Sequence, residues 1–157
     1  MAIDSSAQRR IMSRFATGVT VVTTRGDDHL CGLTASAVAS LSLDPPLILV
    51  AVDKSSHSHG CLKKNRSFAV NVLSIDQEEV SRRFAKTGPK EFVDLSPTTA
   101  VTGAPILSGA LAYLDCRLVE VLPGGDHDIF IGEIVAGDSR EGQPLLYYRG
   151  KYSRLAE

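Results

Sequence analysis

A run of short hydroxyl side chains among small apolar residues is the part of this sequence best suited to hold a ligand. It extends from Gly32 to Ser42 and carries no charge before Asp44. Because its side chains are small, backbone N–H groups and hydroxyls can come close to a bound molecule. The composition suits a flat, partly apolar ligand with a polar or phosphorylated tail. The alternative is an ordinary strand whose hydroxyls bond to neighbouring backbone.

Three further groups of residues could contact such a ligand from other parts of the chain. Lys54 follows a buried strand, where its ammonium group could bind a phosphate or simply be solvated. His127 follows two glycines near the expected tip of a hairpin, which either permit close approach or form a plain turn. The tyrosines and cations of residues 147–152 could stack on a ring and hold a diphosphate, or line a dimer interface.

Residues 55–61 combine serines with possible metal ligands. His57, His59 and Cys61 alternate along the chain, so one face of a strand could present all three to a zinc ion. We find no second pair of cysteines or histidines at close spacing, and the serines favour a turn or a helix start. We therefore predict no metal site and expect these side chains to contact a phosphate or a sugar.

Motifs and composition exclude several classes of protein. The sequence contains neither of the standard glycine-rich phosphate loops and no G-x-S-x-G nucleophile motif. Its 157 residues indicate one domain spanning 1–157, and a net charge of −1 argues against nucleic-acid binding. The longest apolar runs are far shorter than a membrane span, so we predict no membrane partner.

The cysteines and the N-terminal residues bear on the cellular compartment. Cys31, Cys61 and Cys116 are odd in number and scattered, so we predict no disulfide framework. The first residues lack the charged and then apolar pattern of a signal peptide. Both observations favour a reduced, cytoplasmic protein.

The elements that must position these residues are mostly strands. Ser5 and Gln8 suggest a capping box for a helix that ends near Gly18, and Ser74 with Gln77 suggests another for a helix to about Phe84. Residues 86–110 look irregular, and a turn is expected over 123–128. The predicted strands are 19–24, 30–34, 47–52, 67–73, 111–122, 129–135, 145–148 and 151–155. Because strands follow one another directly, an antiparallel barrel with two or three outer helices is favoured.

Taken in order, several segments resemble a known family. They are FATGVTVVT at 15–23, GLTASAVASLSLDPP at 32–46, FAVNVL at 68–73, SRRF at 81–84, GDH at 125–127 and PLLYYRGKY at 144–152. They are similar to the flavin reductase-like family, the small reductase components of two-component flavin-dependent monooxygenases. The resemblance extends from about Arg10 to Leu155, and its specificity lies in the shared order of the segments.

The resemblance implies a mainly β fold, a homodimeric split β-barrel (FMN-binding, Greek-key antiparallel) with a few flanking α-helices. It implies hydride transfer from NADH or NADPH to FMN or FAD, with the reduced flavin passed to a partner monooxygenase. Such a transfer depends on stacking and orientation more than on a protein acid or base. The alternative function is a tightly bound flavin that serves electron transfer or sensing without turnover of free flavin.

The resemblance also assigns roles to individual residues. The flavin ring would be lined by Thr34, Ala35, Ser36, Ala37 and Val38, with Ser40 and Leu41 close behind. The ribityl chain and phosphate would contact Val52, Asp53 and Lys54, with Ser58 and His59 nearby, and the flavin site would be completed by Arg83 and Phe84. The catalytic position is His127, which would meet the nicotinamide. The dinucleotide would be held by Tyr148, Arg149, Gly150 and Lys151.

Overall fold

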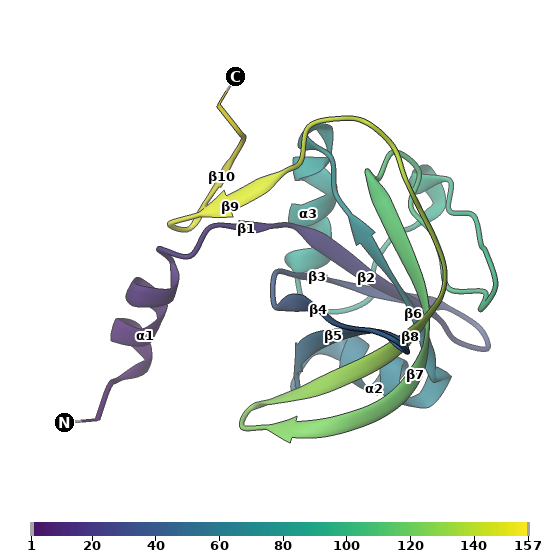
Figure 1. Ribbon diagram of the computed structural model, residues 1–157, viewed down its shortest axis with the longest axis horizontal. Coiled ribbons are helices and arrows are strands. Elements are labelled where there is room, and N and C mark those ends of the chain that lie inside the picture. The colour runs from purple at the N-terminus through teal and green to yellow at the C-terminus, as the bar shows by residue number, and fades with distance from the viewer. Residues whose placement is uncertain (1, 157) are drawn as a thin grey trace.

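The computed structural model describes residues 2–156 and arranges them as an antiparallel β fold with α-helices on its outside (Figure 1). The α-helices are α1 (Ser5–Met12), α2 (His57–Asn65) and α3 (Glu78–Ala85), and two short 3₁₀ helices are η1 (Ile75–Gln77) and η2 (Val93–Leu95). The strands are β1 (Thr17–Gly18), β2 (Thr20–Arg25), β3 (Leu30–Ala35), β4 (Val38–Leu43), β5 (Pro46–Asp53), β6 (Ser67–Val72), β7 (Ala112–Gly124), β8 (His127–Ser139), β9 (Leu146–Tyr148) and β10 (Lys151–Ser153).

The main sheet is strongly curved but open. Its seven strands follow the order β3-β2-β6-β7-β8-β5-β4, and a small second sheet has the order β1-β9-β10. β3 and β4 lie at opposite edges of the main sheet, although only Ser36 and Ala37 separate them in the chain. Two residues span only about 7–10 Å, so the sheet must bend until its edges approach each other there. The edges are not paired, and the closed barrel predicted from the sequence is therefore not confirmed.

Hydrophobic residues fill both sides of the curved sheet. The larger cluster lies inside the curve and includes Phe68 and Phe130, and a second cluster lies under α3 and includes Phe84. The β-branched residues of β2 contribute to both clusters because successive side chains point to opposite faces. Buried Asn71 holds the irregular segment against the sheet, since its Oδ1 accepts a 2.9 Å hydrogen bond from the Leu107 N–H.

The predicted strands are present to within a few residues, and two local predictions need correction. The capping box of Ser74 and Gln77 is confirmed, with the Gln77 side chain accepting from the Ser74 N–H at 2.9 Å. α1 is capped by Asp4 rather than Ser5 and ends at Met12, well before Gly18. The turn predicted over 123–128 is shorter, because β7 reaches Gly124 and β8 begins at His127.

α2 and one cysteine pair were not predicted. Ser56 caps the start of α2, in line with the turn or helix start that the serines favour, so His57, His59 and Cys61 lie on a helix and not on the strand face considered for zinc. The expectation that the cysteines are reduced is wrong for Cys31 and Cys61, which form a disulfide, whereas Cys116 is free and buried. Over residues 2–156, none of the helices combines the length and the apolar character needed to cross a membrane.

Candidate functional site

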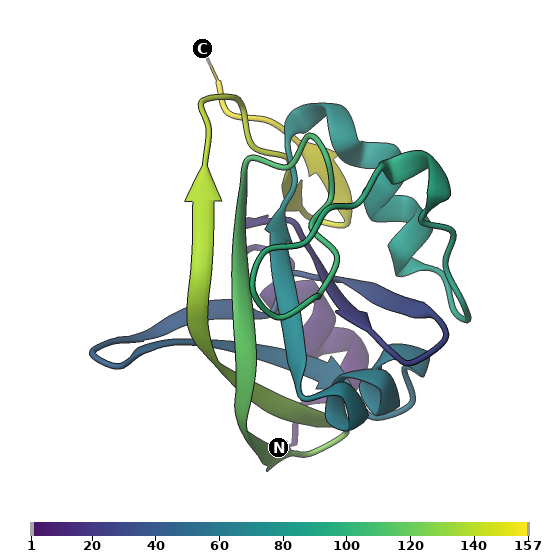
Figure 2. The ribbon, with the colours of Figure 1, turned by 90° about the vertical axis from the view of Figure 1, so that its right-hand side faces the viewer.

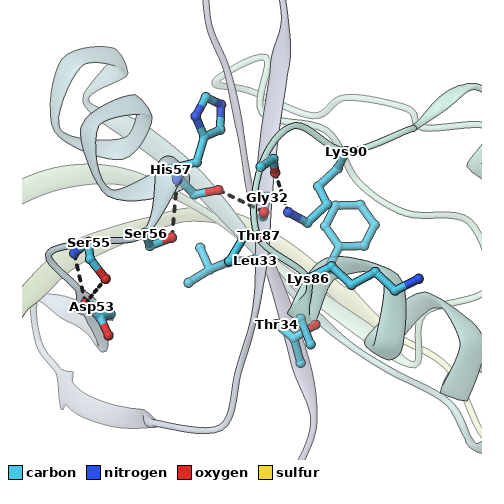
Figure 3. Close-up of a pocket in the computed structure, with 14 residues that line it drawn as sticks. Gly32, Leu33, Thr34, Asp53, Ser55, Ser56, His57, Lys86, Thr87 and Lys90 are labelled. Atoms are coloured by element: carbon cyan, nitrogen blue, oxygen red, sulfur yellow. Dashed lines mark hydrogen bonds between the residues drawn. The ribbon is translucent and has the colours of Figure 1, made fainter.

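A polar cavity of about 390 Å³ lies between β3, the start of α2 and the end of α3 (Figure 3). Its hydroxyl groups come from Thr34, Ser55, Ser56, Ser58 and Thr87, and its ammonium groups from Lys86 and Lys90. Figure 3 shows the lysines entering from the α3 side and the serines from the loop before α2. Hydroxyls and cations that converge in this way suit an anionic ligand such as a phosphate.

Two hydroxyl groups fix the helices to the strand between them. Thr34 Oγ1 donates to the Ser81 carbonyl on α3 at 2.6 Å, and Ser58 Oγ on α2 donates to the Gly32 carbonyl at 2.8 Å. The Phe84 ring packs on Gly32, where a Cβ atom would lie 2.6 Å from the ring. The walls of the cavity are therefore rigid, and the Thr34 and Ser58 hydroxyl protons are already used within the protein.

The charges at this cavity are opposite in sign on its two sides. Burial lowers the pKa of Lys90, whose ammonium group donates to the Gly88 carbonyl. Across the cavity, hydrogen bonds from Ser55 lower the pKa of Asp53, first from its N–H and then from its hydroxyl, and the charges of His127 and His59 contribute further. Asp53 is thus an anion whose Oδ1 accepts both hydrogen bonds from Ser55, and the lysines are the groups that attract a phosphate.

A second, more apolar cavity of about 620 Å³ lies beside α1 and the β9–β10 hairpin. Its apolar and aromatic lining comes from Met12, Phe15, Tyr147 and Tyr148, and its small residues are Ser36 and Ala37. Arg149 also lines it, with a φ of 53° in the turn between β9 and β10 and its N–H bonded to the Ser13 carbonyl at 3.0 Å. Aromatic faces beside small residues suit a flat ring.

The hydroxyl-rich segment connects the two cavities. Thr34 lines the polar cavity, whereas Ser36 and Ala37 line the apolar cavity. A flavin needs this combination, because its phosphate requires cations and hydroxyls and its ring requires a flat apolar surface with nearby donors. The donor set therefore fits a flavin, with Lys86 and Lys90 available for phosphate oxygens.

His127 lies beside the polar cavity at the tip of the β7–β8 hairpin. It pairs with Asp53 in the β5–β8 ladder, and its Nδ1 lies 2.7 Å from Asp126 Oδ1. The Lys54 N–H donates to the Asp126 carbonyl at 3.0 Å, which holds this tip against the end of β5. The His127 side chain is 41% exposed, and Asp53, its partner in the ladder, lines the cavity.

Several predicted site residues have other partners. Arg83 is bonded to Asp94 and Glu79, and these hydrogen bonds raise its pKa above its ordinary value. His59 Nε2 lies 2.7 Å from Asp128 Oδ2, and its ring packs against a core aromatic residue.

The other predicted site residues lie mostly in the core or on other parts of the surface. The side chains of Val52 and Ala35 are buried in the core, and Phe84 contributes a buried wall to the polar cavity. Val38, Ser40 and Leu41 lie on edge strand β4, and Lys151 lines a shallow hollow beside Tyr148.

The sequence interpretation missed the lysines and some of the hydroxyls. Lys86, Thr87 and Lys90 lie in the segment after α3, which was described only as irregular. A signal was present, since two lysines flank Gly88-Pro89 directly after a helix. Ser55 and Ser56 were noted only within the histidine-containing cluster.

The fold and its two cavities define a class of protein that binds a phosphorylated aromatic cofactor next to the ring of a second molecule. The family described as "Flavin reductase like domain" matches residues 12–156. The chain belongs to this family.

Individual relatives agree with this membership. The reductase subunit HsaB of a flavin-dependent monooxygenase from Rhodococcus jostii is 39% identical, with 98% of this chain and 80% of the relative aligned. The FMN reductase (NADH) SmoA of Agrobacterium fabrum is 38% identical over 98% of this chain and 87% of its own. A solved NADH:FAD oxidoreductase of Streptomyces globisporus, in complex with NAD and FAD fragments, has a TM-score of 0.92 and 35% identity, covering 99% of this chain and 97% of that one.

Proposed function

We propose that this protein is an NAD(P)H-dependent flavin reductase that transfers a hydride from NADH or NADPH to FMN or FAD. It delivers the reduced flavin to a separate flavin-dependent monooxygenase. The observation that carries this proposal is the pair of cavities joined by Thr34–Ala37, one polar and cationic and the other aromatic. The relatives named above, an FMN reductase and an FAD oxidoreductase among them, support the same reaction.

The protein's own groups bind and orient the reactants. A bound flavin supplies the hydride acceptor, so the chain needs no acid–base pair. Lys86 and Lys90 hold the phosphate, and backbone N–H groups near Ser36 stabilise negative charge on the ring. His127, at the tip of the β7–β8 hairpin, orients the nicotinamide.

The working form is a homodimer. α1 buries none of its residues, and Figure 1 shows it standing away from the sheet. A helix of eight residues is not stable by itself in water, so the exposed Ile11 and Met12 at its end, and Phe15 just after it, require a surface to cover them. The β4–β5 hairpin also projects from the body in Figure 2 and leaves Leu43 exposed. A second copy of the chain covers both the apolar residues near α1 and Leu43, and its surface also lines the apolar cavity.

The proposed location is the cytoplasm. Reduced nicotinamide nucleotides are metabolites of the cell interior, so a protein that consumes them is expected there. Disulfides of cytoplasmic proteins are usually transient and redox-sensitive. The Cys31–Cys61 pair therefore belongs to that class.

The test is the anaerobic oxidation of NADH or NADPH by the purified chain with free FMN or FAD in large molar excess. We expect many turnovers per chain with at least one of the four combinations. No turnover with any combination contradicts the proposal. A stoichiometric, non-exchanging yellow cofactor with a single turnover would instead identify an electron-transfer or sensor protein.

A further inference from the structure

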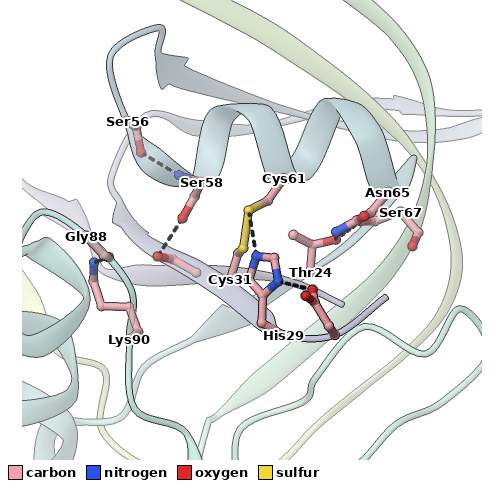
Figure 4. Close-up of a disulfide and its surroundings, with 12 residues drawn as sticks. Thr24, His29, Cys31, Ser56, Ser58, Cys61, Asn65, Ser67, Gly88 and Lys90 are labelled. Carbon is pink, nitrogen blue, oxygen red and sulfur yellow. Dashed lines mark hydrogen bonds and ion pairs between the residues drawn. A yellow bond between two sulfur atoms is a disulfide. The ribbon is translucent and has the colours of Figure 1, made fainter. Parts of the chain in front are cut away.

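Four potential metal ligands from two distant segments meet where α2 packs on the beginning of β3. They are His29, just before β3, Cys31, at its start, and His57 and Cys61, on α2. One ligand atom from each residue lies within 4.8 Å of the others. Figure 4 shows the His29 ring directly beside the Cys31–Cys61 disulfide.

Local backbone geometry accounts for this meeting. His29 and Cys31 are two residues apart at the start of a strand, so their side chains lie on the same side. His57 and Cys61 are four residues apart on α2, which places them one turn apart on the same helix face. His59, between them, points elsewhere and is bonded to Asp128.

The helix is fastened to the hairpin on both sides of the cluster. Ser58 Oγ donates to the Gly32 carbonyl at 2.8 Å, and Asn65 Nδ2 donates to Thr24 Oγ1 at 3.3 Å. The two ligand pairs therefore face each other in a frame that needs no refolding to bring them together. A preformed frame of this kind favours metal binding, because little chain entropy is lost when the ion enters.

Two thiolates and two imidazoles are the donor set of a tetrahedral zinc site. With Zn–S near 2.3 Å and Zn–N near 2.0 Å, donor atoms in such a site lie about 3.3–3.8 Å apart. Cys61 Sγ already lies 3.8 Å from His29 Nε2, and the rings of His29 and His57 are 6.3 Å apart between centroids. Small side-chain rotations are enough to complete the tetrahedron once the disulfide is reduced.

A carboxylate orients one of the histidines for this role. Asp28 Oδ1 lies 2.6 Å from His29 Nδ1 (Figure 4), which directs Nε2 of the same ring toward Cys61 Sγ. Histidines that bind a metal usually donate their other nitrogen to a carboxylate or carbonyl in this way. Asp28 is not itself one of the four ligands, and its contact also indicates that Nε2 is the His29 nitrogen that faces the metal.

We propose that His29, Cys31, His57 and Cys61 bind one zinc-class divalent cation when both cysteines are reduced, and that their disulfide is the metal-free, oxidised state of the same site. In the oxidation, the two thiolates lose two electrons, the S–S bond forms and the cation is released. With a peroxide as oxidant, hydrogen peroxide takes up the two electrons and two protons and becomes two molecules of water. A thiol or phosphine reductant restores the thiolates.

The third cysteine provides an internal control. Cys116 is buried outside the cluster, and burial raises the pKa of its thiol to about 12. It is therefore protonated at neutral pH and is no ligand for a metal ion. A Cys116→Ala variant keeps all four proposed ligands.

The experiment measures zinc in the full-length chain after reduction with a phosphine, loading with Zn²⁺ and desalting. We expect one zinc per reduced chain, none after peroxide treatment, and a mass lower by two hydrogens in the oxidised form. Co²⁺ in the same site should give the thiolate-to-cobalt bands of a tetrahedral complex. Cys116→Ala should bind as the wild type does, and His29→Ala, at an exposed position, should lose most of the affinity without affecting folding.

A matched pair of acidic residues tests the geometry more closely. Asp28→Ala removes the carboxylate that orients His29 and should weaken zinc binding by about ten- to a hundredfold. Asp27→Ala removes the same charge from the adjacent, exposed position and should leave the affinity unchanged. Reduced protein that binds no zinc, zinc that survives oxidation, or equal effects of the two aspartate substitutions would each overturn the proposal.

Discussion

The polar and the apolar cavity differ in how much of their structure one chain supplies. The polar cavity is built on buried residues, such as Phe84 at 1% exposure, and its helices are bonded to β3 through Thr34 and Ser58. The apolar cavity is lined by Phe15 at 70% exposure and by tyrosines that are themselves exposed. One protomer therefore preorganises the polar cavity, whereas the apolar cavity is the one that the proposed dimer would complete.

The largest effect is expected from a substitution that prevents the proposed dimer from forming. Phe15→Asp places a charge on the surface that the proposed dimer desolvates, at a cost of several kcal/mol. We expect a monomer in sedimentation and a loss of at least about a hundredfold in kcat/KM for flavin reduction, since each 1.4 kcal/mol is tenfold. Phosphate binding in the polar cavity should remain.

The control substitution is Val93→Asp. Val93 is a comparably exposed apolar residue on η2, far from α1 in the chain. It should leave both the oligomeric state and the activity unchanged. An active Phe15→Asp monomer would show that one chain suffices for both cavities.

The next effect tests the polar cavity alone. Lys90→Met keeps the length of the side chain and removes the charge assigned to a phosphate. A hydrogen bond to a charged group contributes about 1.5–3 kcal/mol, so the flavin KM should rise at least about tenfold. Sedimentation should still report a dimer.

The matched control for this lysine is Lys63→Met, on the exposed last turn of α2. It removes the same charge outside the cavity, so it should change the flavin KM little. Equal increases for the two lysines would mean that general charge, rather than the cavity, attracts the flavin.

A smaller and more selective effect is expected at His127. Its replacement by alanine removes one hydrogen-bonding contact, which contributes about 0.5–1.5 kcal/mol. The KM for NADH should rise by roughly three- to tenfold while flavin affinity stays nearly constant. Asp126→Asn, which alters only the neighbour of the ring, should have a weaker effect. Equal losses of NADH and flavin binding would contradict the assignment of His127 to the nicotinamide.

Elements with a local cause could be predicted from the sequence, whereas features that depend on contacts between distant segments could not. The β-branched run at 19–24 and the capping box of Ser74 have local causes, and both predicted elements are present. α2 was missed because it buries only Ser58 and Leu62, so its sequence carries little apolar periodicity. The spacing His29-x-Cys31 was overlooked as a second ligand pair, since only the packing of α2 on β3 makes it meaningful. The exposed face of α1 is assigned to the proposed dimer, which no local pattern identifies.

The smallest expected effect is the pH dependence of flavin binding in the polar cavity. Burial lowers the pKa of Lys90, so its ammonium group loses its proton at a lower pH than an ordinary lysine does. The contribution of Lys90 to flavin binding is therefore present below that lowered pKa and declines as the pH rises through it. The decline cannot exceed the loss caused by Lys90→Met, because deprotonation removes the charge but keeps the side chain. Flavin KM measured across the alkaline range should rise in the wild type and stay flat in Lys90→Arg, whose guanidinium group keeps its proton. A parallel rise in both proteins would assign the pH dependence to another group and leave the polar cavity without its titrating lysine.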